Sequence, residues 1–154
     1  MTKRLKQLQL TNLDSRFEKM RFEPKPKSGW IKTIREALSM PLAFPAKRLG
    51  TSQPSVSRLE KNEIDESITL KSLRQLAAAM NCELHYAIVP HGRSLRKIVE
   101  KRAEEKARAM VNDVNNTMSL EDQKIKDPKS SVKFLAKEFA EELNKSLWRD
   151  DNEN

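Results

Sequence analysis

The chain has 154 residues, of which 37% are hydrophobic and 34% charged, so one domain or one and a half with a modest core is expected and a large enzyme fold is excluded. The formal net charge of +8 predicts an anionic partner. A single cysteine, a charged N-terminal segment and the lack of any long apolar run predict a cytoplasmic protein without membrane contact.

Basic charge is concentrated in the front and middle of the chain. Residues 1–28 carry 8 basic and 3 acidic side chains, residues 29–90 carry 8 and 6, and residues 91–118 carry 7 and 4. Residues 119–154 carry 7 basic and 9 acidic side chains. We therefore expect nucleic acid contacts before about residue 118, and an acidic tail that is available for another role.

The first segment, residues 1–28, is predicted to be a basic amphipathic helix followed by a hinge. Its apolar side chains recur mostly every three to four residues as far as Met20, and the Pro-Lys-Pro-Lys sequence at 24–27 must end the helix. Ser28 is expected to cap the next helix, whose apolar stripe begins at Trp30.

Residues 29–81 are predicted to form an array of short helices. Two of them are expected at 42–49 and 52–61, on either side of Gly50 and Thr51. Proline at position 45 lacks an amide hydrogen, so we expect the first of these two helices to start there, after an irregular connection.

The last helix of this array is predicted from its two ends. Thr69 is a typical N-cap, and leucines, Ala77 and Met80 recur behind it at helical spacing. Asn81 is expected to end the helix because asparagine tolerates left-handed backbone angles.

The spacing of Ala46, Gly50, Val56 and Leu59 is typical of a helix-turn-helix. Two crossing helices need a small residue at their contact, glycine in the turn, and two apolar residues that seat the second helix on the first. With these residues turned inward, the polar side chains of the second helix point outward and can bind base edges and phosphates. The outward set is Gln53, Ser55, Ser57 and Arg58.

Three of the outward side chains have an expected role in DNA binding, and all four are candidate contacts. Gln53 suits an adenine edge or a nearby phosphate, Ser55 a base edge, and Arg58 a guanine edge or a phosphate. Lys61 is expected to contact a phosphate. The alternative is an ordinary helical hairpin with a solvated face.

A second phosphate site is expected at the start of the following helix. Thr69 could bind a phosphate through its hydroxyl and the free backbone amides, with Lys71 close by. A plain N-cap explains Thr69 almost as well.

In residues 82–90 the side chains alternate between two faces with a period of two residues, which predicts a β-strand. Leu84, Tyr86 and Ile88 fall on one face, and proline follows at position 90. Because a single strand leaves its edge amides unpaired, we expect it to pair with the same strand of a second subunit, which predicts a homodimer.

Residues 91–118 are predicted to form a long amphipathic helix, and residues 119–154 an acidic helical tail, whose helix begins at Asp127. These helices could simply thicken a dimer core. Alternatively, the tail could dock on another protein. Candidate anchors for such a partner are Phe134, Phe139, Leu143, Leu147 and Trp148.

Enzymatic motifs are not found in the sequence. It contains no glycine-rich phosphate loop, no H-E-x-x-H and no C-x-x-C, so we predict no catalytic site and no cofactor. Cys82 and His85 lie three apart on the predicted strand and therefore on opposite faces, so no metal site is expected.

The sequences GWIKTIREAL, RLGTSQPSVSRLEK and TLKSLRQLAAAMNCELHYAIVP resemble Xre-type, phage-repressor-like helix-turn-helix proteins. The closer resemblance is to the mobile mystery protein A group, and it covers Gly29 to about Gln123. This resemblance implies an antitoxin-like or autoregulatory role beside a Fic-domain protein. The strand after the helical array is also similar to the one that pairs across the dimer in HipB-like antitoxins.

The predicted fold is all-α, an Xre-type helix-turn-helix bundle followed by one short strand and additional C-terminal helices. The predicted function is that of a homodimeric regulator that binds double-stranded DNA at a palindromic operator, with one reading helix in each half-site. The alternative is an interaction protein that mainly neutralises a Fic-domain partner, with DNA binding secondary.

Overall fold

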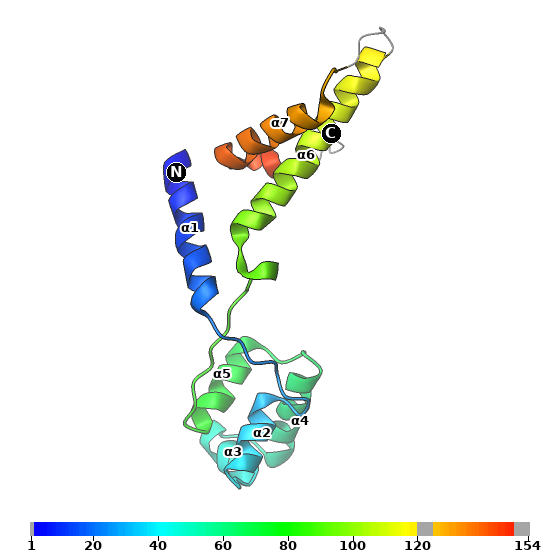
Figure 1. Ribbon diagram of the computed structural model, residues 1–154. Helices are drawn as coiled ribbons and strands as arrows, with labels where there is room; N and C mark the ends of the chain where they lie inside the picture. The colour runs from blue at the N-terminus through cyan, green and yellow to red at the C-terminus, as the bar shows by residue number, and fades with distance from the viewer. Residues whose placement is uncertain (1, 120–124, 150–154) are drawn as a thin grey trace. The chain divides into compact units, whose positions relative to one another are not determined.

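The computed structural model describes residues 2–119 and 125–149, which fold into two compact units (Figure 1). One unit is Arg21–Ala87, and the other combines Met1–Met20 with Ile88–Asn154. The regular secondary structure of the described residues is entirely helical. The helices agree with the predicted all-α class, but the predicted fold is wrong because it included a short strand that the described residues do not form.

The unit Arg21–Ala87 consists of four helices, which surround one apolar core (Figure 1). They are α2 (Trp30–Ala37), α3 (Ala43–Leu49), α4 (Gln53–Ile64) and α5 (Leu70–Ala79). Each helix contributes at least one buried side chain to the core, because each carries apolar residues at helical spacing. The buried members are Ile31, Ala46, Val56, Leu76 and Met80.

A carboxylate from α4 caps α2. The Trp30 and Ile31 amides donate to the two Glu63 carboxylate oxygens at 2.7 and 2.9 Å. Gly29 makes this approach possible, since its φ is +79° and a β-carbon there would lie 2.8 Å from the carboxylate. The prediction that Ser28 caps this helix is therefore wrong, because its hydroxyl pairs with Thr33 instead, at 2.8 Å.

Helix α3 covers nearly the predicted range 42–49, and it does not start at Pro45 as the missing amide hydrogen suggested. It starts at Ala43, and Pro45 is its third residue and is fully buried. The first four amides of a helix have no intrahelical acceptor, so proline in the first turn removes no hydrogen bond. The Phe44 amide donates to the Pro41 carbonyl oxygen at 3.0 Å, which extends the ordered backbone through the connection that we expected to be irregular.

The predicted ends of α5 are confirmed. The Ser72 amide donates to the Thr69 hydroxyl at 3.1 Å, and Asn81 adopts a left-handed conformation with φ of 60°. The Cys82 amide then donates to the Ala77 carbonyl oxygen at 2.8 Å, which closes the C-terminal end of the helix.

The prediction of a β-strand at residues 82–90 is wrong. None of the described residues is assigned to a strand, and residues 82–90 form an irregular connection. Tyr86 and Ile88 are exposed, the latter by 88%. Alternating polarity is compatible with a strand but does not create one, because a strand also requires a neighbouring backbone to complete its hydrogen bonds.

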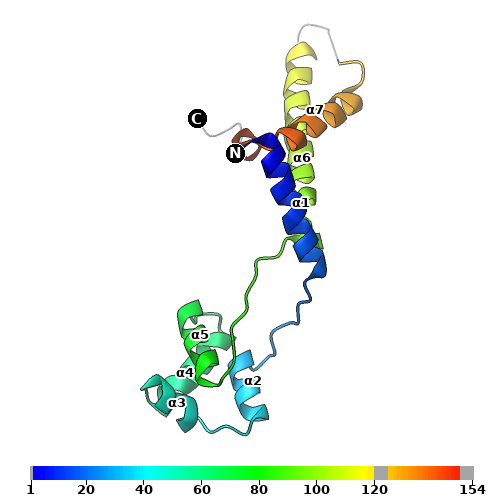
Figure 2. The ribbon, with the colours of Figure 1, turned by 90° about the vertical axis from the view of Figure 1, so that its left-hand side faces the viewer.

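The second unit is built on the long helix α6 (Leu95–Ser119), and α7 (Pro128–Glu142) packs along it (Figures 1 and 2). Helix α1 (Lys3–Lys19) packs on both. Short 3-10 helices, η1 (His91–Arg93) and η2 (Lys145–Trp148), precede α6 and follow α7. None of the described helices is long and apolar enough to cross a membrane.

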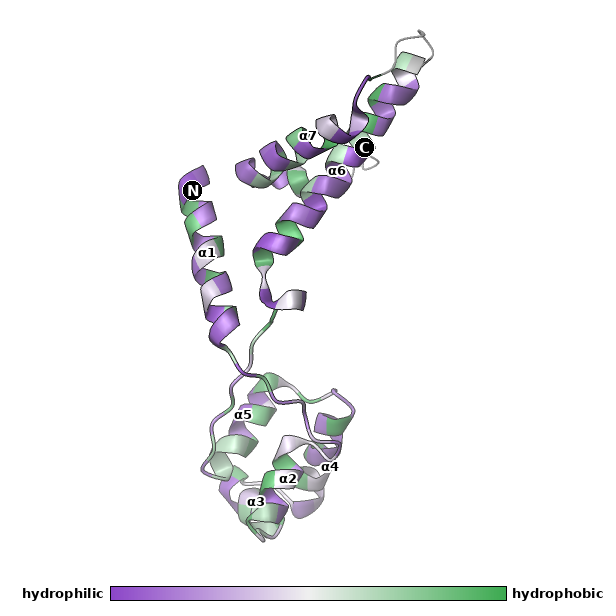
Figure 3. Ribbon diagram, in the orientation of Figure 1, coloured by the Kyte–Doolittle hydropathy of each residue, from purple (hydrophilic) through white to green (hydrophobic). Residues whose placement is uncertain are grey.

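The core of this second unit is thin and lies along one side of α6. Val99 and Ala103 are buried there against Leu147, which is only 1% exposed. Purple and green alternate along α6 in Figure 3, as expected for a helix with one narrow buried stripe. Partly buried side chains complete this core, namely Leu10, Phe139, Ala140 and Leu143.

The C-terminal segment is not one continuous helix, although Leu135, Phe139, Leu143 and Leu147 lie four residues apart in the sequence. Asp127 caps α7 as predicted, since its carboxylate accepts from the Ser130 amide at 3.1 Å. Helix α7 ends at Glu142, and Leu143 takes a left-handed conformation with φ of 46°. The chain then turns into η2, which carries Leu147 back into the core.

Asp14 of α1 caps α6. Its carboxylate accepts from the Leu95 and Arg96 amides at 2.7 and 3.2 Å and from the Ser94 hydroxyl at 2.9 Å. Burial raises the pKa of Asp14, but these hydrogen bonds outweigh it and lower the pKa below its usual 3.8. Helix α1 is therefore tied to the start of α6 by an ionised carboxylate.

The Glu63 cap predicts a measurable loss of stability. We expect Glu63→Gln to lower the free energy of unfolding of the Arg21–Ala87 unit by about 1–3 kcal/mol, because a carboxamide cannot accept from two amides through two charged oxygens. Each unit contains one tryptophan, so urea unfolding followed by Trp30 fluorescence in a Trp148→Phe background reports on this unit. Asp65→Asn, an exposed neighbour, is the control and should change stability little. Equal losses in the two variants would contradict the role of Glu63.

The Asp14 cap predicts a stability effect that depends on pH. Because the folded pKa is lowered, the stabilisation is present above the unfolded pKa and is lost as pH falls through the folded pKa. We expect Asp14→Asn to cost about 0.5–1 kcal/mol at pH 7. Trp148 fluorescence in a Trp30→Phe background measures this cost, which should shrink steadily below about pH 4. A cost that stays constant down to pH 2 would show that the carboxylate charge is not involved.

Candidate nucleic-acid interface

The turn between α3 and α4 has the geometry that its sequence spacing predicts. Ala46 is buried where the two helices meet, and Gly50 is left-handed with φ of 64° and ψ of 35°. The Gly50 amide donates to the Lys47 carbonyl oxygen at 3.2 Å, and the Thr51 amide to that of Ala46 at 3.0 Å. Ser52 then caps α4 by accepting from the Ser55 amide at 3.3 Å.

Helix α4 has one face in the core and one face in solvent. Val56 is completely buried, and Leu59 packs beside it. Ser55 lies between the two faces, half-buried, with its hydroxyl 2.9 Å from that of Ser52. The predicted DNA-contacting side chains that are exposed on this helix are Gln53, Ser57, Arg58 and Lys61.

Both acidic residues of α4 point away from its solvent-exposed face. Glu60 and Glu63 are only 5% and 4% exposed and follow Val56 at the i+4 and i+7 positions. Glu63 caps α2, and Glu60 forms an ion pair with Arg35, Oε1 to Nε 2.6 Å. The exposed face of α4 therefore carries polar and basic side chains without an acidic one, which suits a polyanion.

Residues 31–86 match the helix-turn-helix family. This region is a helix-turn-helix domain. The match begins in α2, includes α3, the Gly50 turn, α4 and α5, and ends in the connection after α5. No curated protein and no solved structure matches the chain.

The helix-turn-helix domain offers a second polar site at the start of α5. Thr69 and Lys71 are both exposed there. The Thr69 hydroxyl accepts from the Ser72 amide at 3.1 Å and pairs with the Ser72 hydroxyl at 2.9 Å. The structure thus shows Thr69 acting as an N-cap, and a phosphate contact by Thr69 or Lys71 remains a prediction.

A buried ion pair, which was not predicted from the sequence, positions α4. Arg35 donates to both Glu60 oxygens, at 2.6 and 3.2 Å, and to the Met40 carbonyl oxygen at 3.0 Å. Hydrogen bonding to Glu60 raises the pKa of Arg35, so the guanidinium stays charged. The helical spacing of the sequence could have indicated that these carboxylates are buried, because Glu60 and Glu63 continue the inward-facing stripe of α4 that starts at Val56.

The residues predicted to contact protein partners have different surroundings. Leu147 lies in the core of its own unit, and Phe139 and Leu143 pack against it, so these three are occupied within the fold. Phe134 and Trp148 are exposed by 63% and 52%.

Residues 82–90, which follow the helices of the helix-turn-helix domain, hold the side chains predicted to contact a second subunit and the two that were considered for a metal site. Leu84 is half-buried, whereas Tyr86 and Ile88 are exposed. Cys82 packs against the domain core, and the exposed His85 pairs with Glu83 at 3.3 Å. In the part of the chain that the structure describes, no three His, Cys, Asp or Glu side chains gather as a metal site would require.

The exposed face of α4 predicts the effect of a single substitution. We expect Arg58→Ala to weaken binding to a specific DNA site by about 1–3 kcal/mol, because it removes a bidentate donor. Fluorescence anisotropy at near-physiological salt measures this change. Arg16→Ala removes the same charge from α1, in the other unit, and should leave specific binding almost unchanged. If the Arg58→Ala variant bound the specific DNA site as tightly as the wild-type protein, the role assigned to Arg58 would be excluded.

Proposed function

We propose that the protein is a sequence-specific DNA-binding transcriptional regulator. The observation that carries this proposal is the exposed face of α4, on which Gln53, Ser57, Arg58 and Lys61 lie without an acidic side chain. The match of residues 31–86 to the helix-turn-helix family supports it independently. In this motif the second helix enters the major groove, and its N-terminal residues reach base edges.

The positions of the side chains along α4 support different DNA contacts for each of them. Gln53 stands at the N-terminal end, where it suits an adenine edge or a phosphate, and Arg58 one and a half turns later suits a guanine edge or a phosphate. Lys61 lies nearer the C-terminal end and is assigned to a phosphate. Ser55 is already bonded to Ser52, so a base contact would require its hydroxyl to exchange partners.

The regulator is proposed to act as a homodimer on a palindromic operator. Helix-turn-helix dimers place their reading helices in two half-sites about 34–36 Å apart, one turn of DNA. Tyr86 and Ile88 support a second copy as partner, because both are exposed apolar side chains on the connection that follows the domain.

A second candidate function is binding to a Fic-domain protein, as an antitoxin that represses its own operon. The resemblance of the sequence to the mobile mystery protein A group implies this companion. Phe134 and Trp148 support a protein partner, since they are large exposed hydrophobic side chains in the unit that lacks the helix-turn-helix. The two functions are compatible, because they use different units.

Specific DNA recognition is tested by comparing two duplexes. We expect the protein to prefer DNA from upstream of its own gene over a scrambled duplex by roughly a thousandfold or more, measured by anisotropy at near-physiological salt. Titrations at several salt concentrations separate this preference from non-specific attraction to phosphates. Equal affinity for the two duplexes would contradict autoregulation and would leave partner binding as the leading function.

A further inference from the structure

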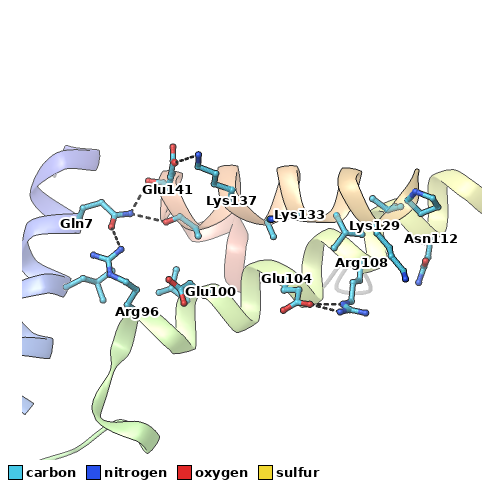
Figure 4. A pocket seen from close by; sticks show the side chains of 17 residues that line it. Gln7, Arg96, Glu100, Glu104, Arg108, Asn112, Lys129, Lys133, Lys137 and Glu141 are labelled. Atoms are coloured by element: carbon cyan, nitrogen blue, oxygen red, sulfur yellow. Dashed lines mark hydrogen bonds and ion pairs between the residues drawn. The ribbon is translucent and has the colours of Figure 1, made fainter. Parts of the chain in front are cut away.

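An open groove runs between α6 and α7 in the unit that lacks the helix-turn-helix (Figure 4). It has a volume of about 960 Å³ and is closed at one end by Gln7 and Leu10 of α1. Its α6 wall extends from Arg96 to Asn112, which corresponds to about 24 Å of helix. The groove therefore has the length of a helix of about 16 residues.

The floor of the groove is apolar. The side chains that form it come from all three helices of the unit and carry no charge. They are Leu10, Val99, Val111, Val132, Ala136 and Ala140. Ala136 and Ala140 are small, so a helix backbone could approach the α7 side of the floor closely.

The two edges of the groove carry different charges (Figure 4). Lys129, Lys133 and Lys137 follow one another every four residues along the α7 edge. The α6 edge is mixed, since it carries Glu100 and Glu104 between Arg96 and Arg108. An acidic edge of an occupant would therefore meet opposite charge along α7, and a basic side chain would meet opposite charge on α6 at Glu100.

Some of these charges are already neutralised within the unit. Lys137 pairs with Glu141, Oε1 to Nζ 4.0 Å, and Glu104 with Arg108, Oε1 to Nε 3.2 Å. In the described residues, Lys129, Lys133 and Glu100 have no ion-pair partner. Two lysines on one edge and one glutamate on the other are thus free to select a ligand.

We propose that this groove binds an amphipathic helix of a partner protein. The partner helix places an apolar stripe on the floor of the groove. Its acidic edge presents two carboxylates, four residues apart, to Lys129 and Lys133, and its opposite edge presents a basic side chain to Glu100. This site is separate from α4, so the proposal does not depend on DNA binding.

A second copy of the chain fits this groove less well. The exposed leucines of α1, Leu5 and Leu8, line one shallow hollow with Arg16, and Arg4 precedes Leu5 in the sequence. This basic stripe would meet Lys129 and Lys133 with like charge. The charges of the groove therefore favour a different, acidic helix.

Designed peptides test whether the charges on the edges of the groove select the partner helix. The first probe is a fluorescein-labelled 16-residue helix with a Leu-Ala stripe, Glu at two positions four apart on one edge and Arg on the other. The second probe carries Lys at the two Glu positions. We expect the full-length protein to bind the first peptide about tenfold more tightly than the second, and the difference to shrink at high salt.

Two variants of the full-length protein locate the site. Lys129→Glu combined with Lys133→Glu should reverse the preference between the peptides, whereas Lys145→Glu, an exposed lysine outside the groove, should preserve it. Ala136→Phe fills the floor and should weaken binding of both peptides at least tenfold. Circular dichroism checks that each variant remains folded, and the charge variants alter only exposed side chains.

Three results would overturn the proposal. The first is failure of both peptides to bind, or equal binding of the two. The second is conversion of a dimer to a monomer by Ala136→Phe in sedimentation velocity, which would assign the groove to a second copy. The third is displacement of the bound peptide by a scrambled DNA duplex, which would assign the lysine row to nucleic acid. Operator binding by the charge variants is measured in parallel, so failure of the groove proposal and failure of the DNA-binding proposal are distinguishable.

Discussion

The attachment of α2 to α4 by two buried carboxylates is the constraint on which the helix-turn-helix domain depends. Glu63 accepts the first amides of α2, and Glu60 holds Arg35 near the other end of the same helix. Arg35 also binds the Met40 carbonyl oxygen, which ties down the connection to α3. A buried carboxylate without partners would be very costly, so both interactions must form together with the core.

This attachment also determines what α4 presents to solvent. The two carboxylates that neutralise a helix terminus and a guanidinium are thereby removed from the outer surface, where they would repel phosphates. Arg58 and Lys61 consequently stand on an exposed face without acidic neighbours on the same helix. The other unit uses the same device, since Asp14 of α1 caps α6 from a distant part of the chain. In each unit a carboxylate joins two helices that are far apart in sequence.

Features that depend on neighbouring residues could be predicted. The caps at Thr69 and Asp127 and the left-handed Asn81 follow from local backbone chemistry, and each is present. The inward position of Val56 follows from helical period in the same way. The prediction for residues 82–90 failed because alternating polarity describes side chains, while a strand is made by hydrogen bonds to a second backbone. The acceptor of the α2 cap was missed because it lies more than thirty residues away.

The sequence by itself determined where the helices of the DNA-binding region lie, and which side of α4 carries its polar side chains. These properties depend on periodicity and on residues within a few positions of one another. Only the tertiary structure decided which groups Glu60 and Glu63 bind, that Leu147 fills the core of its own unit, and that a groove opens between α6 and α7. Such features depend on contacts between distant segments, whose partners are selected by packing and by the need to satisfy buried charge.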